Sequence, residues 1–341
     1  MSDFVWGLLF VILAGILAGG SSAPIKWMRF FRYEHWALIS VLIGMLILPW
    51  SILLCSADIK TVMANIPVAA LVKANLFSLA WGVANVLAGL CLLRIGFSLS
   101  VGILTGVGLP IGVLIPMICR GSGMFADAPT LFSRAGLFIV PGVIIMLGAL
   151  VLITRAGFGK ETGAEREERR PNGGFKTGLV MATTAGVLQV GLSFAFIYSQ
   201  GPINEALRAA HAGTAGMLVG VWAFTLPGGL LVNLGYILWR LYRHRNWRRF
   251  MIAPREVALS VLIGIAFLGF VASLGIGMQM MGALGASIGF GIYQTMQVAS
   301  SQAVGFISGE WHQAPAKNLR QMRLALFLLL IAVVCFSAGK V

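Results

Sequence analysis

The chain has few charged residues for its length. Of its 341 residues only 11% are Asp, Glu, Lys or Arg, whereas 58% are hydrophobic, and the mean hydropathy is +0.91. A water-soluble protein of this length could not bury so much apolar surface. The composition therefore predicts an integral membrane protein that crosses the lipid bilayer several times.

The sequence also lacks the patterns of catalytic and metal-binding proteins. Its four cysteines form no CxxC pair, its four histidines are isolated in predicted loops, and no HExxH, GxSxG or P-loop spacing occurs. Such spacings bring nucleophiles, bases and metal ligands within reach of one another. We therefore expect neither an enzyme nor a bound metal or cofactor. An ion channel is a weaker alternative, because the sequence has no ring-forming charge or repeated filter-like motif.

The excess of basic residues does not indicate a nucleic-acid partner. The formal net charge is +14, but the Lys and Arg residues lie between apolar segments rather than on one face or tail. Nineteen of the 25 fall in connections that would share one side of the membrane, and six fall in the others. By the positive-inside rule, the richer set is cytoplasmic. Both termini are then expected on the periplasmic side of the cell inner (cytoplasmic) membrane.

Ten apolar segments are each long enough to cross a hydrocarbon core of about 30 Å as a helix. None shows the two-residue alternation of a membrane strand, so the predicted fold class is all-α integral membrane, with ten transmembrane helices. A soluble-looking linker, 156–174, separates five segments in 1–155 from five in 175–341. The expected spans are residues 4–22, 36–54, 74–93, 98–119, 134–154, 175–199, 213–239, 257–280, 285–307 and 322–339.

An odd number of spans in each half makes the two halves enter the membrane in opposite senses. The sequence therefore predicts two inverted five-helix repeats, the usual build of secondary transporters. A short internal similarity supports this prediction: Ile95–Ile103 reads IGFSLSVGI and Leu284–Ile292 reads LGASIGFGI, with four identities at an offset of 189. Both segments begin the fourth span of their half.

A few polar side chains fall inside the predicted spans. A polar group in hydrocarbon is costly unless it is paired or faces a wet cavity, so these residues are candidates for a binding site. Tyr293 and Gln297 lie one turn apart on one face of the ninth span, and Gln294 lies beside them. The alternative is that the amides merely join neighbouring helices. The candidate substrate-binding residues are Trp81, Asn85, Gln189, Gln279, Tyr293, Gln294 and Gln297.

No charged residue lies in the middle of a predicted span. An exporter of lipophilic cations would need a buried carboxylate, and a sugar-phosphate carrier would need a buried Lys or Arg. Amides and hydroxyls instead match the hydroxyls of a sugar, and an aromatic ring can cover the apolar face of a sugar ring. The residues therefore favour a small neutral sugar as the ligand.

Short motifs occur in a fixed order along nearly the whole chain. They are APIK from Ala23, LPW from Leu48, WGVANVLAGL from Trp81, IGFSLSVGI from Ile95, ITRAG from Ile153, VNLGY from Val232 and GEW from Gly309. In these motifs and their order the chain resembles the L-rhamnose–proton symporter (RhaT-like) family of the drug/metabolite transporter superfamily. The resemblance implies ten helices in two inverted five-helix repeats, a central sugar site and proton-driven uptake by alternating access. The expected substrate is a 6-deoxyhexose such as L-rhamnose, and the alternative is an amino-acid or other small-metabolite exporter of the same superfamily.

The proton coupling implied by the resemblance requires a group that gains and loses a proton during transport. Because no acid lies in the middle of a span, Glu310 at the expected cytoplasmic end of the ninth span is the candidate. The alternative is a solvated carboxylate at the helix end, neutralised by Arg320 or Arg323.

Overall fold

The computed structural model describes residues 3–21, 23–95, 97–119, 128–160, 174–312 and 314–339. Within these ranges the chain is helical and has no β-strand, as the sequence predicts. The first half contains α1 (Asp3–Gly20), η1 (Ala23–Trp27), α2 (Tyr33–Val41), η2 (Leu42–Ile47), α3 (Leu48–Ser56), α4 (Ile59–Asn65), α5 (Val68–Ile95), α6 (Phe97–Ile118) and α7 (Arg134–Lys160). The second half contains α9 (Gly174–Leu188), α10 (Gly191–Ala209), α11 (Thr214–Thr225), α12 (Pro227–His244), α13 (Arg249–Ile252), α14 (Pro254–Met280), η4 (Gly282–Leu284), η5 (Gly285–Gly289), α15 (Phe290–Ile307) and α16 (Ala316–Ala338).

The helices are those of an integral membrane protein. The described part of the chain contains eight helical segments that are long and apolar enough to cross a membrane. Helices α11 and α12, bent by 58° relative to each other, would together make a ninth. The expected span 285–307 coincides with η5 and α15, but it falls outside this set because three glutamines make α15 less apolar. The predicted linker 156–174 overlaps the end of α7, and its residues 161–173 lie outside the described part of the chain.

Glycines let α1 pack closely against α14 and α15 of the second half. A Cβ atom on Gly15 would lie 2.8 Å from the carbonyl oxygen of Tyr293, and one on Gly7 would lie 2.9 Å from that of Gly277. These distances leave no room for a side chain, and small residues commonly permit such close approach between membrane helices. The approach brings the end of α1 beside the polar face of α15.

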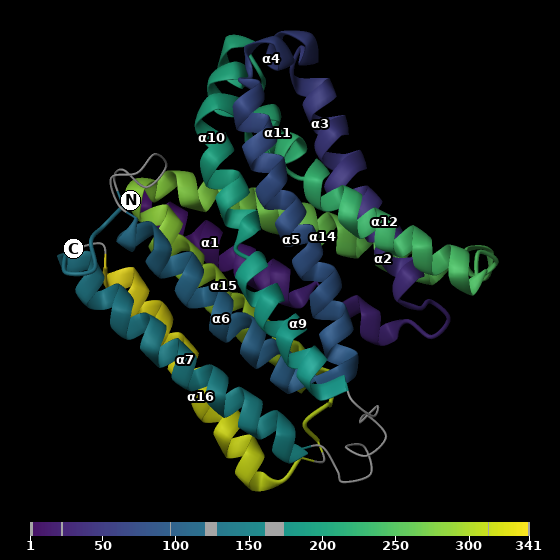
Figure 1. Cartoon of the computed structure of the whole chain (residues 1–341), viewed down its shortest axis with the longest axis vertical. Coiled ribbons are helices and arrows are strands. Elements are labelled where there is room, and N and C mark those ends of the chain that lie inside the picture. Colours follow the sequence, from purple (N-terminus) through teal and green to yellow (C-terminus); the bar gives the residue numbers. More distant parts are fainter. Residues whose placement is uncertain are drawn as a thin grey trace.

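The other helices complete the bundle around this contact. In Figure 1, α7 and α16 pack along one edge, and α6 lies next to α7. Helix α5 contacts α9, α10 and α12, while α2 contacts both α12 and α14. Residues far apart in the sequence therefore meet in the middle of the bundle, where α2, α5, α12, α14 and α15 contribute side chains to one cavity.

Candidate functional site

A cavity of about 420 Å³ lies among helices from both halves of the chain. Its volume is within the range of roughly 300–1,000 Å³ that is typical of small-molecule sites. Its lining includes Ala18 and Ser21 at the end of α1 and Tyr33 at the start of α2, so the cavity reaches the end of the bundle that carries the basic segment 26–32.

Six of the seven residues predicted for the site line this cavity. They are Trp81, Asn85, Gln189, Tyr293, Gln294 and Gln297. The seventh, Gln279, is exposed one residue before the end of α14 and is not among the lining residues. The lining comes from segments more than 200 residues apart in the sequence, and helix packing alone brings them together.

Aromatic rings from α14 form one wall. Phe267 stacks on Trp81 of α5 with ring centroids 6.0 Å apart, and Phe270 stacks on Tyr293 of α15 with centroids 5.2 Å apart. Phe267 and Phe270 are three residues apart on a helix, so both rings project from the same face. Such flat apolar surfaces can cover the apolar face of a ring-shaped ligand.

The amides of the cavity fall into two groups: Gln189 and Asn233 are bonded to backbone carbonyls, and the other described ones are not. Gln189, between α9 and α10, donates from Nε2 to the carbonyl oxygen of Leu104 at 2.7 Å, and therefore joins two helices. Within the described ranges, the side-chain amides of Asn85, Gln294 and Gln297 have no protein hydrogen-bond partner. Amides shielded from bulk water need partners. These three are therefore available to a ligand that both donates and accepts hydrogen bonds.

No charged side chain is among the described residues that line the cavity. Behind its wall, the guanidinium of Arg240 lies 5.6 Å from the centre of the Tyr33 ring. Within the same part of the chain, no group of three His, Cys, Asp or Glu residues could hold a metal ion. The cavity therefore suits an uncharged polar ligand.

The sequence interpretation missed several lining residues. Tyr33, Trp36 and Ser40 lie on one face of α2, where hydropathy started the span only at residue 36. Their spacing of three and four residues was the available signal. The contribution of α14 was also missed, because Phe267 and Phe270 do not differ in sequence from phenylalanines that face lipid.

Glu310 lies away from the cavity, beyond the end of α15. Its Oε1 is 2.7 Å from Nζ of Lys26, and Lys26 also donates a hydrogen bond to Oγ of Ser308 at 2.6 Å. The Glu310 side chain is 49% exposed. Among the described residues, the ion-pair partner of Glu310 is therefore Lys26 of η1 rather than Arg320 or Arg323.

Comparison with known proteins identifies the family. The family model described as L-rhamnose-proton symport protein (RhaT) matches residues 1–340. Proteins named L-rhamnose-proton symporter from Cronobacter sakazakii (strain ATCC BAA-894) and Yersinia pestis bv. Antiqua (strain Antiqua) are 26% and 25% identical, covering 98% of this chain and 97% and 98% of theirs. The symporter of Escherichia coli O1:K1 / APEC is 25% identical over 98% of this chain and 97% of its own length. The resemblance predicted from short motifs is thus confirmed: the chain belongs to the L-rhamnose-proton symport protein (RhaT) family.

Proposed function

We propose that this chain is a secondary transporter that takes up a 6-deoxyhexose such as L-rhamnose together with protons, by alternating access. The observation that carries the proposal is an uncharged cavity between the two halves of the chain, in which free amides face aromatic walls. The family and the named relatives are symporters, which supports a transporter rather than an enzyme. An amino-acid exporter is less well supported, because no described charged residue of the cavity would pair with an ammonium or carboxylate group.

The direct test is uptake of labelled L-rhamnose into proteoliposomes with an inside-alkaline pH gradient. We expect accumulation above the external concentration, and collapse of this accumulation when a protonophore removes the gradient. Lyxose, fucose, mannose and a panel of amino acids serve as competitors. Saturable binding of amino acids without binding of sugars would contradict the proposal and favour the exporter.

Within the cavity, we assign Asn85, Gln294 and Gln297 to the sugar hydroxyls, and Trp81 and Tyr293 to the apolar face of the ring. Gln189 also lines the cavity, but its bond to Leu104 gives it a part in helix packing as well. Gln279 is left out of the proposed site because of its exposed position.

Replacing Asn85 or Gln297 with alanine is expected to weaken sugar binding. One lost hydrogen bond to a neutral ligand is worth about 0.5–1.5 kcal/mol, and about 3 kcal/mol where a buried partner is left unpaired. Binding of labelled L-rhamnose to purified protein measures the effect, with thermal unfolding recorded alongside.

Gln189→Ala is the matched control, because the Gln189 amide is already bonded to the backbone carbonyl of Leu104 and joins two helices. We expect it to lower the unfolding temperature more than Asn85→Ala or Gln297→Ala does. Wild-type affinity in both cavity variants would show that these amides do not contact the sugar.

The proposal includes ten spans in two inverted repeats, 1–155 and 175–341, joined by the linker 156–174. The helix contacts support it, because each half packs its first helix on the third and fourth spans of the other half. Helix α1 packs on α14 and α15, and its counterpart α9 packs on α5 and α6. A Cβ atom on Gly186 of α9 would lie 2.8 Å from the carbonyl oxygen of Leu104, as one on Gly15 would from that of Tyr293. Leu104 and Tyr293 are the pair that the offset of 189 aligns.

The proposed orientation places the termini in the periplasm and the mouth of the cavity, near Ser21 and Tyr33, at the cytoplasm. We expect a cysteine at Thr214 to react with a membrane-impermeant maleimide outside intact cells, in a background without the native cysteines. A cysteine at Arg248 should react only after permeabilisation, because α11 and α12 cross the membrane between these positions. The reverse pattern would overturn the proposed orientation. Labelling of both cysteines from outside would show that α11 and α12 do not cross the membrane between them.

For proton coupling, Glu310 is the residue proposed from the sequence. Its position after α15, the helix of Tyr293 and Gln297, supports a coupling role. Its exposed pairing with Lys26 is what an ordinary surface ion pair would also give. If Glu310 carries the proton, Glu310→Gln will abolish gradient-driven accumulation of sugar in proteoliposomes; full accumulation would exclude it.

A further inference from the structure

We propose that Glu34 is the carboxylate that binds the transported proton, and that it exchanges this proton for its ion pair with Arg240. The inference rests on the proposed sugar–proton symport, and it assigns the group that couples the two. It concerns a side chain that does not stand out in the sequence, because Glu34 precedes the apolar segment of its span.

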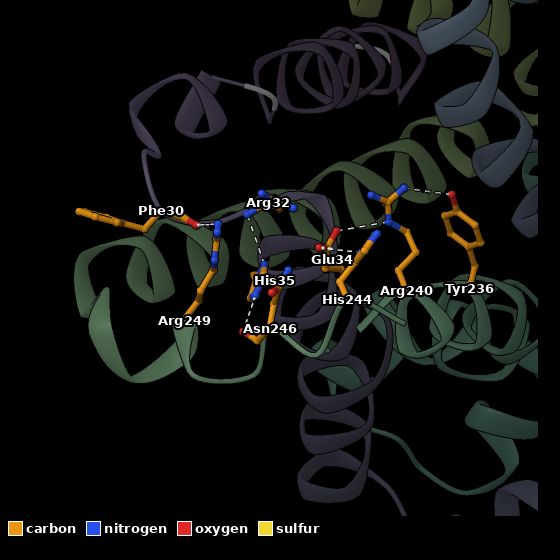
Figure 2. Close-up of polar contacts among 9 residues, drawn as sticks. All are labelled: Phe30, Arg32, Glu34, His35, Tyr236, Arg240, His244, Asn246 and Arg249. Atoms are coloured by element: carbon orange, nitrogen blue, oxygen red, sulfur yellow. Dashed lines mark hydrogen bonds and ion pairs between the residues drawn. The ribbon is translucent and has the colours of Figure 1, made fainter. Parts of the chain in front are cut away.

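The carboxylate of Glu34 is fully buried in the first turn of α2, with 0% of the side chain exposed. Figure 2 shows it between two side chains of α12: Oε2 is 3.3 Å from Nε of Arg240, and Oε1 is 3.4 Å from Nδ1 of His244. Within the described chain, Oε1 accepts no hydrogen bond. Oε1 therefore lies within ion-pair distance of His244 but accepts no hydrogen bond from the described residues, and a buried carboxylate oxygen of this kind can hold a proton.

The other described carboxylates do not combine burial with an oxygen that accepts no hydrogen bond. Both oxygens of the buried Glu256 accept backbone N–H groups. Glu310 is half exposed and paired with Lys26. The remaining ones, Asp3, Asp58 and Glu205, are exposed or half-exposed. Glu34 is therefore the strongest candidate among the acids that the structure describes.

Both ring nitrogens of the neighbouring His35 already have partners. Nδ1 of His35 accepts the backbone N–H of Arg32 at 3.3 Å, and Nε2 faces the carbonyl oxygen of Asn246 at 3.1 Å. Protonation of Nδ1 would break the first of these bonds. The titratable or charged groups that face Glu34 are His35 on its own helix and Arg240 and His244 on α12, with Tyr33 and Tyr236 beside Arg240. On α14, the carboxylate of Glu256 binds the backbone of residues 29–31.

The Glu34–Arg240 pair links proton binding to conformation because it joins the two halves of the chain. While the guanidinium is in contact, it favours the ionised carboxylate; when the contact opens, burial favours the protonated acid. In the opened state, the proton sits on Oε1 and Arg240 keeps its charge. The ring of Tyr236, on the same helix as Arg240 and 6.0 Å from the guanidinium, stays beside it. When the pair closes again, the proton leaves to water beside His244, whose side chain is 36% exposed.

The same helix turn borders the sugar cavity. Tyr33, Trp36, Ala37 and Ser40 of α2 line the cavity, and Glu34 projects from the same turn toward α12. Opening the ion pair removes one of the contacts that hold this end of α2 against α12, and so lets one wall of the cavity move. Proton binding and sugar access are thereby coupled through α2.

The test compares gradient-driven accumulation with exchange in proteoliposomes. One proton per sugar supports up to about tenfold accumulation of L-rhamnose per pH unit in the wild type. Glu34→Gln imitates the protonated acid, so we expect no accumulation above the external concentration, while counterflow of labelled L-rhamnose stays within about twofold of wild type. The double variant Glu34→Gln/Arg240→Gln also removes the Arg240 charge that Glu34→Gln leaves unpaired. We expect it likewise to lose accumulation and to keep counterflow. Glu205→Gln, an exposed carboxamide control, should accumulate sugar normally.

Full accumulation of sugar by Glu34→Gln would overturn the inference. If Glu310→Gln loses accumulation and Glu34→Gln keeps it, Glu310 is the residue that binds the proton. Loss of folded protein or of counterflow in both Glu34 variants would also overturn it, in favour of a structural ion pair. Failure of the proposed function looks different: a wild type that exchanges sugar without accumulation is a facilitator, and one that neither binds nor exchanges sugar has another substrate.

Discussion

Replacing Glu256 with alanine is expected to lower the free energy of unfolding by about 2–4 kcal/mol, because it leaves several backbone donors without a partner. The carboxylate, in the first turn of α14, accepts the N–H groups of Arg29 and Phe31 at 2.6 Å each, and that of Phe30 at 3.0 and 3.1 Å. Glu256 is 5% exposed and Phe31 is 8% exposed, so water cannot fully replace these bonds. The backbone N–H groups of residues 29–31, in the segment that leads into α2, are thus all bound by one carboxylate.

Thermal or denaturant unfolding of purified protein in one detergent measures this loss. Glu256→Gln should be intermediate, because its amide retains one acceptor oxygen. Glu205→Ala removes an exposed carboxylate of α10 and should change stability by less than about 0.5 kcal/mol. Equal stability of Glu256→Ala and wild type would mean that residues 29–31 are held by other contacts.

The same variant is expected to weaken sugar binding. Tyr33 and Trp36 follow directly after the segment that Glu256 holds, and both line the cavity. Release of residues 29–31 therefore lets the start of α2 move relative to the cavity.

Gly19→Ala is expected to destabilise the protein by about 1–3 kcal/mol and to impair sugar binding, because the added methyl group forces α1 and α15 apart. The new Cβ atom would collide with the carbonyl oxygen of Gln297, and would lie 2.8 Å from the nitrogen of Ser301. Both of these are backbone atoms and cannot rotate away. A shift of α15 at this point moves the Gln297 amide out of its place in the cavity.

Gly20 provides the matched control in the same turn of α1. A Cβ atom at Gly20 would meet only Oγ of Ser300, at an ordinary contact distance of 3.7 Å. Gly20→Ala should therefore stay within about 1 kcal/mol of the wild type. Binding of L-rhamnose and thermal unfolding of the two variants give the comparison. Equal behaviour of both variants would contradict the close packing of α1 on α15.

Much of the fold and of the candidate site could be predicted from the sequence for a local reason. An apolar run of about 20 residues has few options in a bilayer other than a helix. A polar side chain within such a run is conspicuous, so the sequence alone indicates Asn85, Gln294 and Gln297 as candidate site residues. The family was recognisable from short motifs such as that beginning at Trp81, and the family comparison confirms it.

Only the tertiary structure decided how these residues act together. Gln189 and Gln297 are the same residue type in predicted spans and both line the cavity, yet among the described residues Gln189 is bonded to a backbone carbonyl and Gln297 is not. Gln279, equally polar, lies on the surface. Hydropathy is summed along the chain and does not report which side of a helix meets another helix.

The contact between Glu34 and Arg240 depends on tertiary structure most strongly. These residues are 206 positions apart, and neither lies in the middle of an apolar run. Glu34 is buried because α12 crosses α2 at its first turn, and the crossing places one cation and one histidine against the carboxylate. The sequence by itself determined that the chain is a helical membrane protein whose spans carry amides but no charged residue at their middles. The packing of the helices decided which amides face the cavity and which acid is shielded from water, because burial depends on neighbours that are distant in the sequence.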